Sequence, residues 1–143
     1  MFISTKGRYA LRALVEMTEH QPDGFLPLKD IAVRQEISEK YLESIVKILV
    51  TGGLIIGVRG KGGGYRLGKS PEQIRVGEVL KLTEGSFAPS KCMEDKGYLC
   101  PRMAQCRTLP FWNGLFDVIN RYIDSYTIAD LTRPDQPGND YVI

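Results

Sequence analysis

The sequence predicts a mainly α-helical protein with a small β wing, built as a winged helix-turn-helix followed by a long C-terminal helix. Three observations predict this fold. Residues 28–50 show two helical patterns separated by a short turn. Residues 54–67 show two short strand patterns on either side of a basic, glycine-rich segment. A long amphipathic pattern begins at Pro110.

The first predicted helix covers residues 5–20, with apolar side chains recurring on one face. Its basic start could contact phosphate or could simply be solvated surface. The only histidine of the chain, His20, falls at the other end of this helix, where a cation is favourable. We interpret His20 as a helix-end residue rather than a metal ligand.

The helix-turn-helix pattern consists of a helix at residues 28–34, a turn at residues 35–37 and a second helix at residues 38–50. Ser38 is a favourable N-cap for the second helix, because its hydroxyl can accept a free backbone N–H of the first turn. The apolar stripe of this helix is formed by Leu42, Ile45 and Leu49. Its opposite face carries Lys40, Glu43, Ser44 and Lys47.

The two predicted strands, residues 54–58 and 64–67, enclose a basic tip at residues 59–63. A helix fits the DNA major groove, and a glycine-rich tip with Arg and Lys can approach phosphates or the narrow minor groove closely. The spacing of glycines from Gly63 to Ser70 also matches a phosphate-binding P-loop. We reject nucleotide hydrolysis, because no series of βα units for a parallel sheet follows this stretch.

The charges of the chain are unevenly distributed, although the net charge is only +2. Residues 29–69 contain eight Lys or Arg and four Asp or Glu, a balance of +4, and residues 1–12 contain three basic residues and no acid. Residues 113–143 contain two Arg and five Asp, a balance of −3. A basic front and an acidic back favour one anionic partner, although chance patchiness is the alternative.

The hydrophobic content of 43% can supply a core, and no apolar run reaches the length of a membrane span. The N-terminus lacks the apolar segment of a secretory signal. We therefore expect a cytoplasmic protein that does not contact membranes, whose cysteines are reduced.

Three segments carry a family resemblance: Ile3–Ala10, Ile37–Glu43 and the wing sequence Arg59–Gly68. They occur in the same order as in the Rrf-type family of bacterial winged-helix transcription regulators, which includes IscR, NsrR and CymR, and the resemblance extends from about Met1 to Leu131. The chain departs from the family at Glu36, where glycine is usual. If this position has a positive φ, Glu costs roughly 1 kcal/mol more than Gly.

The resemblance implies a homodimeric, sequence-specific regulator of transcription, which we expect to be a repressor of palindromic operators in double-stranded DNA. Glu43 could accept a hydrogen bond from a cytosine amino group, repel the wrong backbone register, or be merely solvated. The candidate DNA-binding residues are Lys6, Tyr9, Ser38, Lys40, Tyr41, Glu43, Ser44, Lys47, Arg59, Gly60 and Lys61.

All three cysteines, Cys92, Cys100 and Cys106, fall in residues 85–107, a segment with little periodic structure. Three soft thiolates on one segment are typical of an iron–sulfur cluster or a zinc site. The spacing does not match a standard zinc finger, and a fourth ligand is missing from the segment. Bare thiols or a redox-active disulfide therefore remain alternatives.

The resemblance adds that cluster-binding members of the family carry three cysteines here, although the first interval in this chain is longer than usual. The start Lys6-Gly7-Arg8-Tyr9 is closer to the IscR-like members, so we favour a [2Fe–2S] over a [4Fe–4S] cluster. The positions of the fourth ligand in IscR-like and NsrR-like members hold Leu109 and Arg8 here. The fourth ligand is therefore open, with Glu94, Asp95, solvent or a small thiol as substitutes.

The long amphipathic pattern predicts a dimerisation helix within residues 108–132, as the resemblance also implies; the alternative is a helix that packs only within its own chain. A Thr127–Asp130 capping box predicts a short terminal helix, and residues 133–143 are expected to form a flexible tail. A short helix at 76–82 should complete the winged domain, residues 1–84. The predicted dimer residues are Trp112, Leu115, Ile119, Tyr122 and Tyr126.

Two functional alternatives use the same sequence features. The first is a clusterless winged-helix regulator that senses redox state or a small thiol or metabolite through the cysteine segment. The second is a metal or thiol redox enzyme, which we disfavour because a single histidine provides little acid–base equipment. A protein-interaction adaptor is a third use of the fold. We expect no enzymatic activity.

Overall fold

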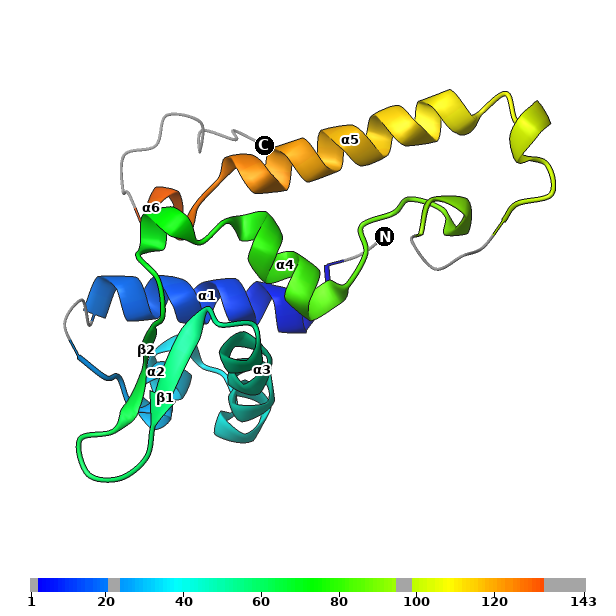
Figure 1. Cartoon of the computed structure of the whole chain (residues 1–143). Helices are drawn as coiled ribbons and strands as arrows, with labels where there is room; N and C mark the ends of the chain where they lie inside the picture. Colours follow the sequence, from blue (N-terminus) through cyan, green and yellow to red (C-terminus); the bar gives the residue numbers. More distant parts are fainter. Residues whose placement is uncertain (1–2, 21–23, 95–98, 133–143) are drawn as a thin grey trace.

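The structure is a computed structural model that describes residues 3–20, 24–94 and 99–132. Six α-helices and one β-hairpin dominate these residues, which confirms the predicted mainly helical fold with a small wing (Figure 1). The main elements are α1 (Thr5–His20), α2 (Leu28–Gln35), α3 (Glu39–Thr51), β1 (Ile55–Val58), β2 (Gly64–Leu67), α4 (Val76–Glu84), α5 (Leu109–Ser125) and α6 (Ile128–Leu131). Short 3-10 turns occupy Pro71–Gln73, Lys91–Met93 and Met103–Gln105.

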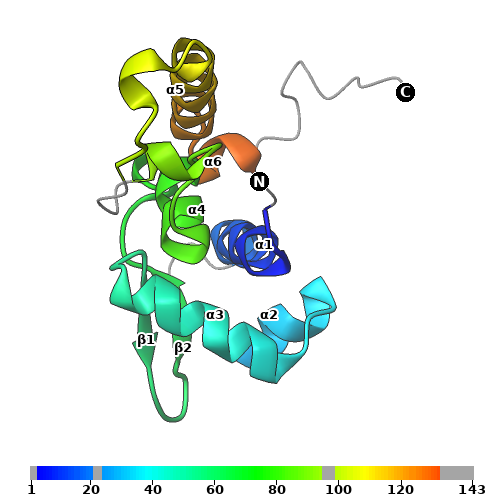
Figure 2. The same cartoon turned by 90° about the vertical axis from the view of Figure 1, so that its right-hand side faces the viewer.

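Helix α1 is the centre of the molecule: α2, α3 and the wing lie on one side of it, and α4 and α5 on the other (Figures 1 and 2). The core forms where the apolar face of α1 meets the inner faces of α2, α3 and the start of the wing. This cluster excludes solvent from nearly all of its side chains, as the periodicity predicts. Its fully buried members include Ala10, Ala13, Leu14, Ile31, Leu42, Ile45, Leu49 and Leu54.

The turn of the helix-turn-helix has the backbone conformation that the family glycine implies. Glu36 adopts φ 54° and ψ 44°, a left-handed conformation that costs a side-chain-bearing residue roughly 1 kcal/mol. Its side chain is exposed, so the substitution creates no steric conflict. Ser38 then caps α3, accepting a hydrogen bond of 3.1 Å from the Tyr41 amide, as predicted.

The wing is an antiparallel hairpin in which Ile55 pairs with Leu67 and Val58 pairs with Gly64. Tyr65 also exchanges two backbone hydrogen bonds, of 2.8 and 2.9 Å, with Leu26 in the connection between α1 and α2. These two hydrogen bonds tie the wing to the connection between α1 and α2. The P-loop-like stretch is thus the second strand of a hairpin and not a phosphate cradle.

The C-terminal helices follow the predicted order. Helix α6 begins at a capping box in which Thr127 Oγ1 accepts from the Asp130 amide at 3.2 Å and Asp130 Oδ2 accepts from the Thr127 amide at 2.9 Å. Helix α4 is two residues longer than predicted and ends at Glu84, because Gly85 turns the chain away with φ 81°. Residues 133–143 and Asp95 lie outside the described residues.

Within the described part of the chain, no helix has both the length and the apolar character that a membrane span requires.

Candidate nucleic-acid interface and cysteine segment

The polar face of α3 is free of the protein core. Lys40, Glu43, Ser44 and Lys47 are all exposed, while Tyr41 is half-buried. Lys47 Nζ lies 3.4 Å from Glu43 Oε1, one helical turn earlier, so these two side chains form a surface ion pair. The hydroxyl of Ser38 is used as the helix cap, and its contact with DNA stays a prediction.

The start of α1 contacts the start of α3 through aromatic rings. The rings of Tyr9 and Tyr41 meet edge to face with their centroids 5.9 Å apart, and the guanidinium of Arg12 lies 5.0 Å from the centre of the Tyr9 ring. Lys6, one turn before Tyr9, is half-buried. The ring contact therefore places Tyr9 of α1 and Tyr41 of α3, two of the predicted residues, side by side.

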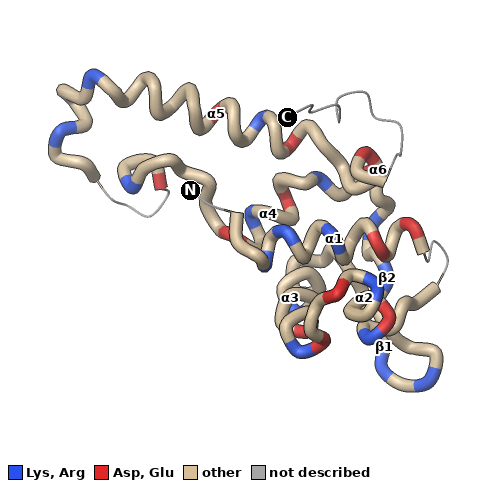
Figure 3. The backbone as a smooth tube through the Cα atoms, turned by 180° about the vertical axis from the view of Figure 1, so that it is seen from behind, with Lys and Arg blue, Asp and Glu red and all other residues tan. Residues whose placement is uncertain are grey.

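The wing tip lies at the opposite end of the molecule from α5. Arg59, Gly60 and Lys61 are exposed, and Gly60 and Gly62 have φ values of 99° and 76° that only glycine adopts without strain. Figure 3 shows the two basic positions of the tip projecting beyond the body. The arrangement can place two cations and an unobstructed backbone against a polyanion.

A buried carboxylate, which the sequence did not single out, holds the helix-turn-helix against α1. Glu16 is only 3% exposed. Its two oxygens accept from Arg34 Nη1 at 3.1 Å and from Gln35 Nε2 at 2.6 Å, and His20 Nδ1 lies 3.0 Å from Oε1. His20 is therefore a partner of Glu16 as well as a helix-end residue. Arg12 continues this network by donating to Gln35 Oε1 at 3.0 Å.

We expect Glu16→Ala to lower the free energy of unfolding by about 3 kcal/mol, the low end of the range for breaking a buried ion pair, because Arg34 can recover some water. Urea unfolding followed by circular dichroism measures this loss. Glu19→Ala, which removes the same charge from an exposed position on α1, should change stability by less than about 0.5 kcal/mol. Equal stability of the two variants would contradict a structural role for Glu16.

The cysteine segment lies between the end of α4 and the start of α5, away from α3 and the wing (Figure 1). Its three thiols are free and half-buried. Cys92 Sγ lies 3.0 Å from Ser90 Oγ, and Cys106 Sγ lies 3.4 Å from Thr108 Oγ1. Hydrogen bonds from Thr108, with smaller contributions from Leu109 and Arg102, lower the pKa of Cys106 and favour its thiolate.

The donor set suits a metal, but the geometry does not assemble it. Among the described residues, no three His, Cys, Asp or Glu side chains are gathered closely enough to hold a metal ion. Binding of a cluster by Cys92, Cys100 and Cys106 would therefore require the segment to close. Glu94 is half-buried in the same segment, whereas Asp95 is outside the described residues.

Helix α5 carries two apolar stripes rather than one. Ile119 and Tyr126, predicted as dimer contacts, pack together with Phe116 and Ile123 against α4 residues and Phe87 of the same chain. A second stripe, roughly a quarter turn around the helix, remains uncovered. It consists of Phe111, Leu115, Val118 and Tyr122; Leu115 is half-buried, whereas Phe111 is 65%, Val118 54% and Tyr122 59% exposed.

Trp112, the remaining residue predicted for the dimer, is half-buried, and its ring meets that of Phe111 with centroids 4.9 Å apart. The stripe that contains Ile119 therefore packs within its own chain, and the stripe that contains Val118 is available for a partner.

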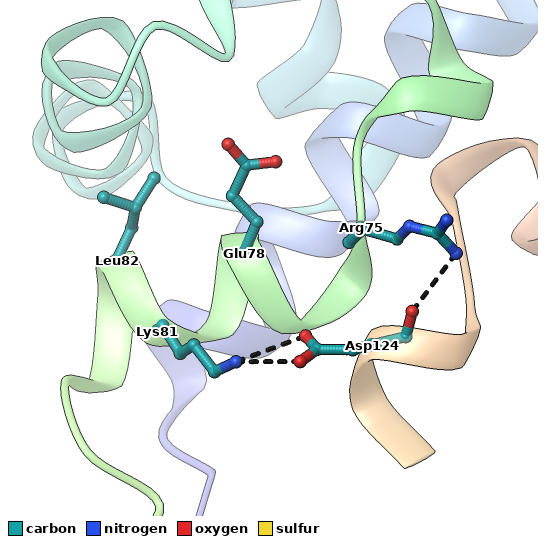
Figure 4. A pocket seen from close by; sticks show the side chains of 5 residues that line it. All are labelled: Arg75, Glu78, Lys81, Leu82 and Asp124. Atoms are coloured by element: carbon teal, nitrogen blue, oxygen red, sulfur yellow. Dashed lines mark hydrogen bonds and ion pairs between the residues drawn. The ribbon is translucent and has the colours of Figure 1, made fainter. Parts of the chain in front are cut away.

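A polar junction fixes α5 on α4 (Figure 4). Lys81 Nζ lies 3.0 and 3.3 Å from the two carboxylate oxygens of Asp124, and Arg75 donates to the Asp124 carbonyl at 3.2 Å. A Cβ atom on Gly77 would overlap Asp124 Oδ1 and lie 3.1 Å from Ile123 Cγ1, so a side chain there would force these α5 side chains to shift. These side chains line a surface pocket together with Glu78 and Leu82, but they are largely occupied with one another.

Comparison with known proteins places this arrangement in a family. The model of the Rrf2 family, described as an iron-dependent transcriptional regulator, matches residues 3–134. The chain belongs to the Rrf2 family. It is 38% identical over 131 residues to the HTH-type transcriptional regulator IscR of Aliivibrio salmonicida, an alignment that covers 92% of this chain and 77% of that protein. It is also 38% identical over 133 residues to protein rrf2 of Nitratidesulfovibrio vulgaris, covering 93% and 88%.

Solved Rrf2-type structures share the fold. The structure of CymR, the global cysteine regulator of B. subtilis, superposes with a TM-score of 0.75 at 36% identity, covering 92% of this chain and 96% of that chain. T. potens IscR gives a TM-score of 0.69 at 31% identity, covering 92% and 85%. The chain is thus a transcriptional regulator of the Rrf2 type.

Proposed function

We propose that this Rrf2 chain is a homodimeric repressor that binds a palindromic operator in the cytoplasm. The observation that carries the proposal is the separation of two surfaces. The exposed polar face of α3, the start of α1 and the basic wing tip lie on one side, and the uncovered stripe of α5 lies on the other. A dimer joined through α5 would present two such DNA-binding surfaces to successive half-sites.

In this proposal, α3 enters the major groove and the wing tip lies at the flanking minor groove. Arg59 and Lys61 contact the backbone and position the protein, while Glu43 reads a base edge. The ion pair with Lys47 holds the Glu43 carboxylate on the exposed face of α3, 3.4 Å from the Lys47 ammonium. A cytosine amino group is the base donor that such a carboxylate prefers.

The experiment that tests DNA binding selects operators from random duplex DNA with the full-length protein. The proposal predicts a palindromic consensus and an affinity whose logarithm falls linearly with the logarithm of the salt concentration. Absence of an enriched sequence, together with salt-independent binding, would refute the proposal. A consensus without dyad symmetry would refute the dimeric form of it.

We also propose that Cys92, Cys100 and Cys106 hold an iron–sulfur cluster, with [2Fe–2S] favoured over [4Fe–4S]. Support comes from the three free thiols on one segment, the lowered pKa of Cys106 and the description of the family as iron-dependent. When bound, such a group would cross-link residues 92–106 and sense oxidants or iron supply. The fourth ligand is undefined.

We expect protein purified without oxygen to be coloured and to contain iron and acid-labile sulfide. Replacing any one of the three cysteines by Ala should remove most of the visible absorbance, because a ligand set of two thiols is incomplete. Ser90→Ala is the matched control, since it removes the hydroxyl beside Cys92 without removing a thiol. Colourless, iron-free wild-type protein after anaerobic reconstitution would instead favour a clusterless regulator that senses through the thiols.

A further inference from the structure

The first turn of α1 is capped by a residue from the far end of the winged domain. Glu84, the last residue of α4, accepts a hydrogen bond of 2.6 Å from the Ser4 hydroxyl and one of 3.0 Å from the Gly7 amide, both on its Oε1 atom. Helix N-termini leave such amides unpaired, and a nearby side chain usually satisfies them. Here the acceptor for the Gly7 amide comes from 77 residues away in the sequence, and the same carboxylate oxygen also accepts from the Ser4 hydroxyl.

This contact is closely packed. A Cβ atom on Gly7 would lie 2.5 Å from Glu84 Oε1 and 3.2 Å from a methyl carbon of Leu80, so a side chain there would displace the Glu84 carboxylate from its present position. Partial burial of the carboxyl raises its pKa, but the hydrogen bonds from Ser4 and Gly7 and the charge of Lys6 outweigh that effect. The pKa of Glu84 is therefore below its ordinary value, and the cap is an anion near a helix N-terminus.

Glu84 also lies where two functional parts of the molecule meet. The next residue, Gly85, begins the segment that contains the three cysteines. On the other side, the capped turn carries Lys6, and Tyr9 of the following turn contacts Tyr41 of α3 through the ring pair at 5.9 Å. The cysteine segment therefore begins directly after Glu84, which anchors the DNA-facing end of α1. A displacement of the segment would act on this anchor through a single peptide bond.

We propose that Glu84 is a positioning residue through which the state of the cysteine segment changes the DNA-facing first turn of α1. The inference rests on the proposed DNA binding but is independent of the nature of the ligand on the thiols. It predicts that perturbing the thiols loosens or shifts residues 4–9, and that this effect needs the Glu84 carboxyl.

The test compares full-length wild type, Glu84→Ala, Glu84→Gln and Glu19→Ala, each with free thiols and with all three cysteines alkylated by iodoacetamide. Two quantities are measured: the hydrogen exchange of residues 5–8, and the affinity for a labelled duplex of the operator that the wild-type protein selects. Glu84→Gln keeps an acceptor oxygen for Ser4 and Gly7 but removes the charge. Glu19→Ala removes a charge from the exposed end of α1 without altering the cap.

In the wild type and in Glu19→Ala, alkylation should change operator affinity by about fivefold or more, the lower end of typical coupling between sites, and should change exchange at residues 5–8. In Glu84→Ala, exchange there should be fast in both thiol states and the affinity ratio should approach one. Glu84→Gln should be intermediate. Circular dichroism verifies that each variant is folded.

Two results would overturn the inference: a wild-type response that Glu84→Ala retains in full, or exchange at residues 5–8 that does not respond to alkylation of the wild type. Failure of the proposed function is a different result, because a wild-type protein that selects no operator can still show the exchange response and its loss in Glu84→Ala.

Discussion

Replacing Arg59 and Lys61 together by Ala is expected to weaken operator binding by two orders of magnitude or more and to flatten its salt dependence. Both side chains are exposed on a glycine-rich tip, so the change removes charge without removing packing. Each lost phosphate contact lowers the slope of log affinity against log salt by about 0.9, or by about 3.6 for a dimer that loses two contacts in each chain. Fluorescence anisotropy across a salt series measures both quantities.

The matched control for the wing variant is Lys91→Ala with Arg107→Ala. This pair removes the same two charges from exposed positions in the cysteine segment, at the other end of the molecule. The slope of log affinity against log salt for this control should equal that of the wild type. If the wing variant also keeps the wild-type slope, the wing is not part of the DNA interface.

Val118→Asp is expected to convert the dimer to a monomer and to reduce binding to a palindromic operator to that of a half-site. Val118 is 54% exposed in the single chain, so the substitution is tolerated there. In an α5–α5 contact it would bury an unpaired charge on each side, at a cost of about 3–5 kcal/mol for each uncompensated ion. Sedimentation velocity reads the mass, and loss of the linkage between half-sites should reduce operator affinity at least about 100-fold.

Asn113→Asp adds the same charge on the opposite side of α5 and should remain a dimer with unchanged operator affinity. Ile119 is a poor position for this test, because it packs against α4 and Phe87 and a charge there would damage the chain itself. A dimeric Val118→Asp protein would place the contact between subunits elsewhere.

Periodicity and turn chemistry were sufficient to predict the helix-turn-helix, the wing and both predicted caps. Ser38 and Thr127 act on residues within one turn of themselves, and such local preferences are expressed in the sequence. The departure at Glu36 came from the family resemblance, and the positive φ at that position agrees with the glycine that the family usually has there.

The parts that the sequence could not predict depend on distant partners. Glu84 caps a helix 77 residues earlier, and Glu16 is buried only because α2 folds across it. On α5, apolar residues at both three- and four-residue spacings form one broad pattern in the sequence. The rotation of α5 about its own axis decides which half of that pattern faces α4. The other elements of the chain impose this rotation. Ile119 and Tyr126 pack within the chain, and their predicted contact with a second chain stays a prediction.

Gly77, at the junction of α4 and α5, affects the spacing of the operator half-sites that a dimer can bind. If two chains join through α5, the angle between α5 and α4 sets the distance between the two α3 helices, and so the number of base pairs between half-sites. A side chain on Gly77 would overlap Asp124 Oδ1, and we expect α5 to tilt away from α4 to make room for it. Gly77→Ala should accordingly change the preferred spacer length in operator selection while leaving the half-site sequence intact. A glycine that contacts no base would then determine the length of the DNA spacer between the two half-sites.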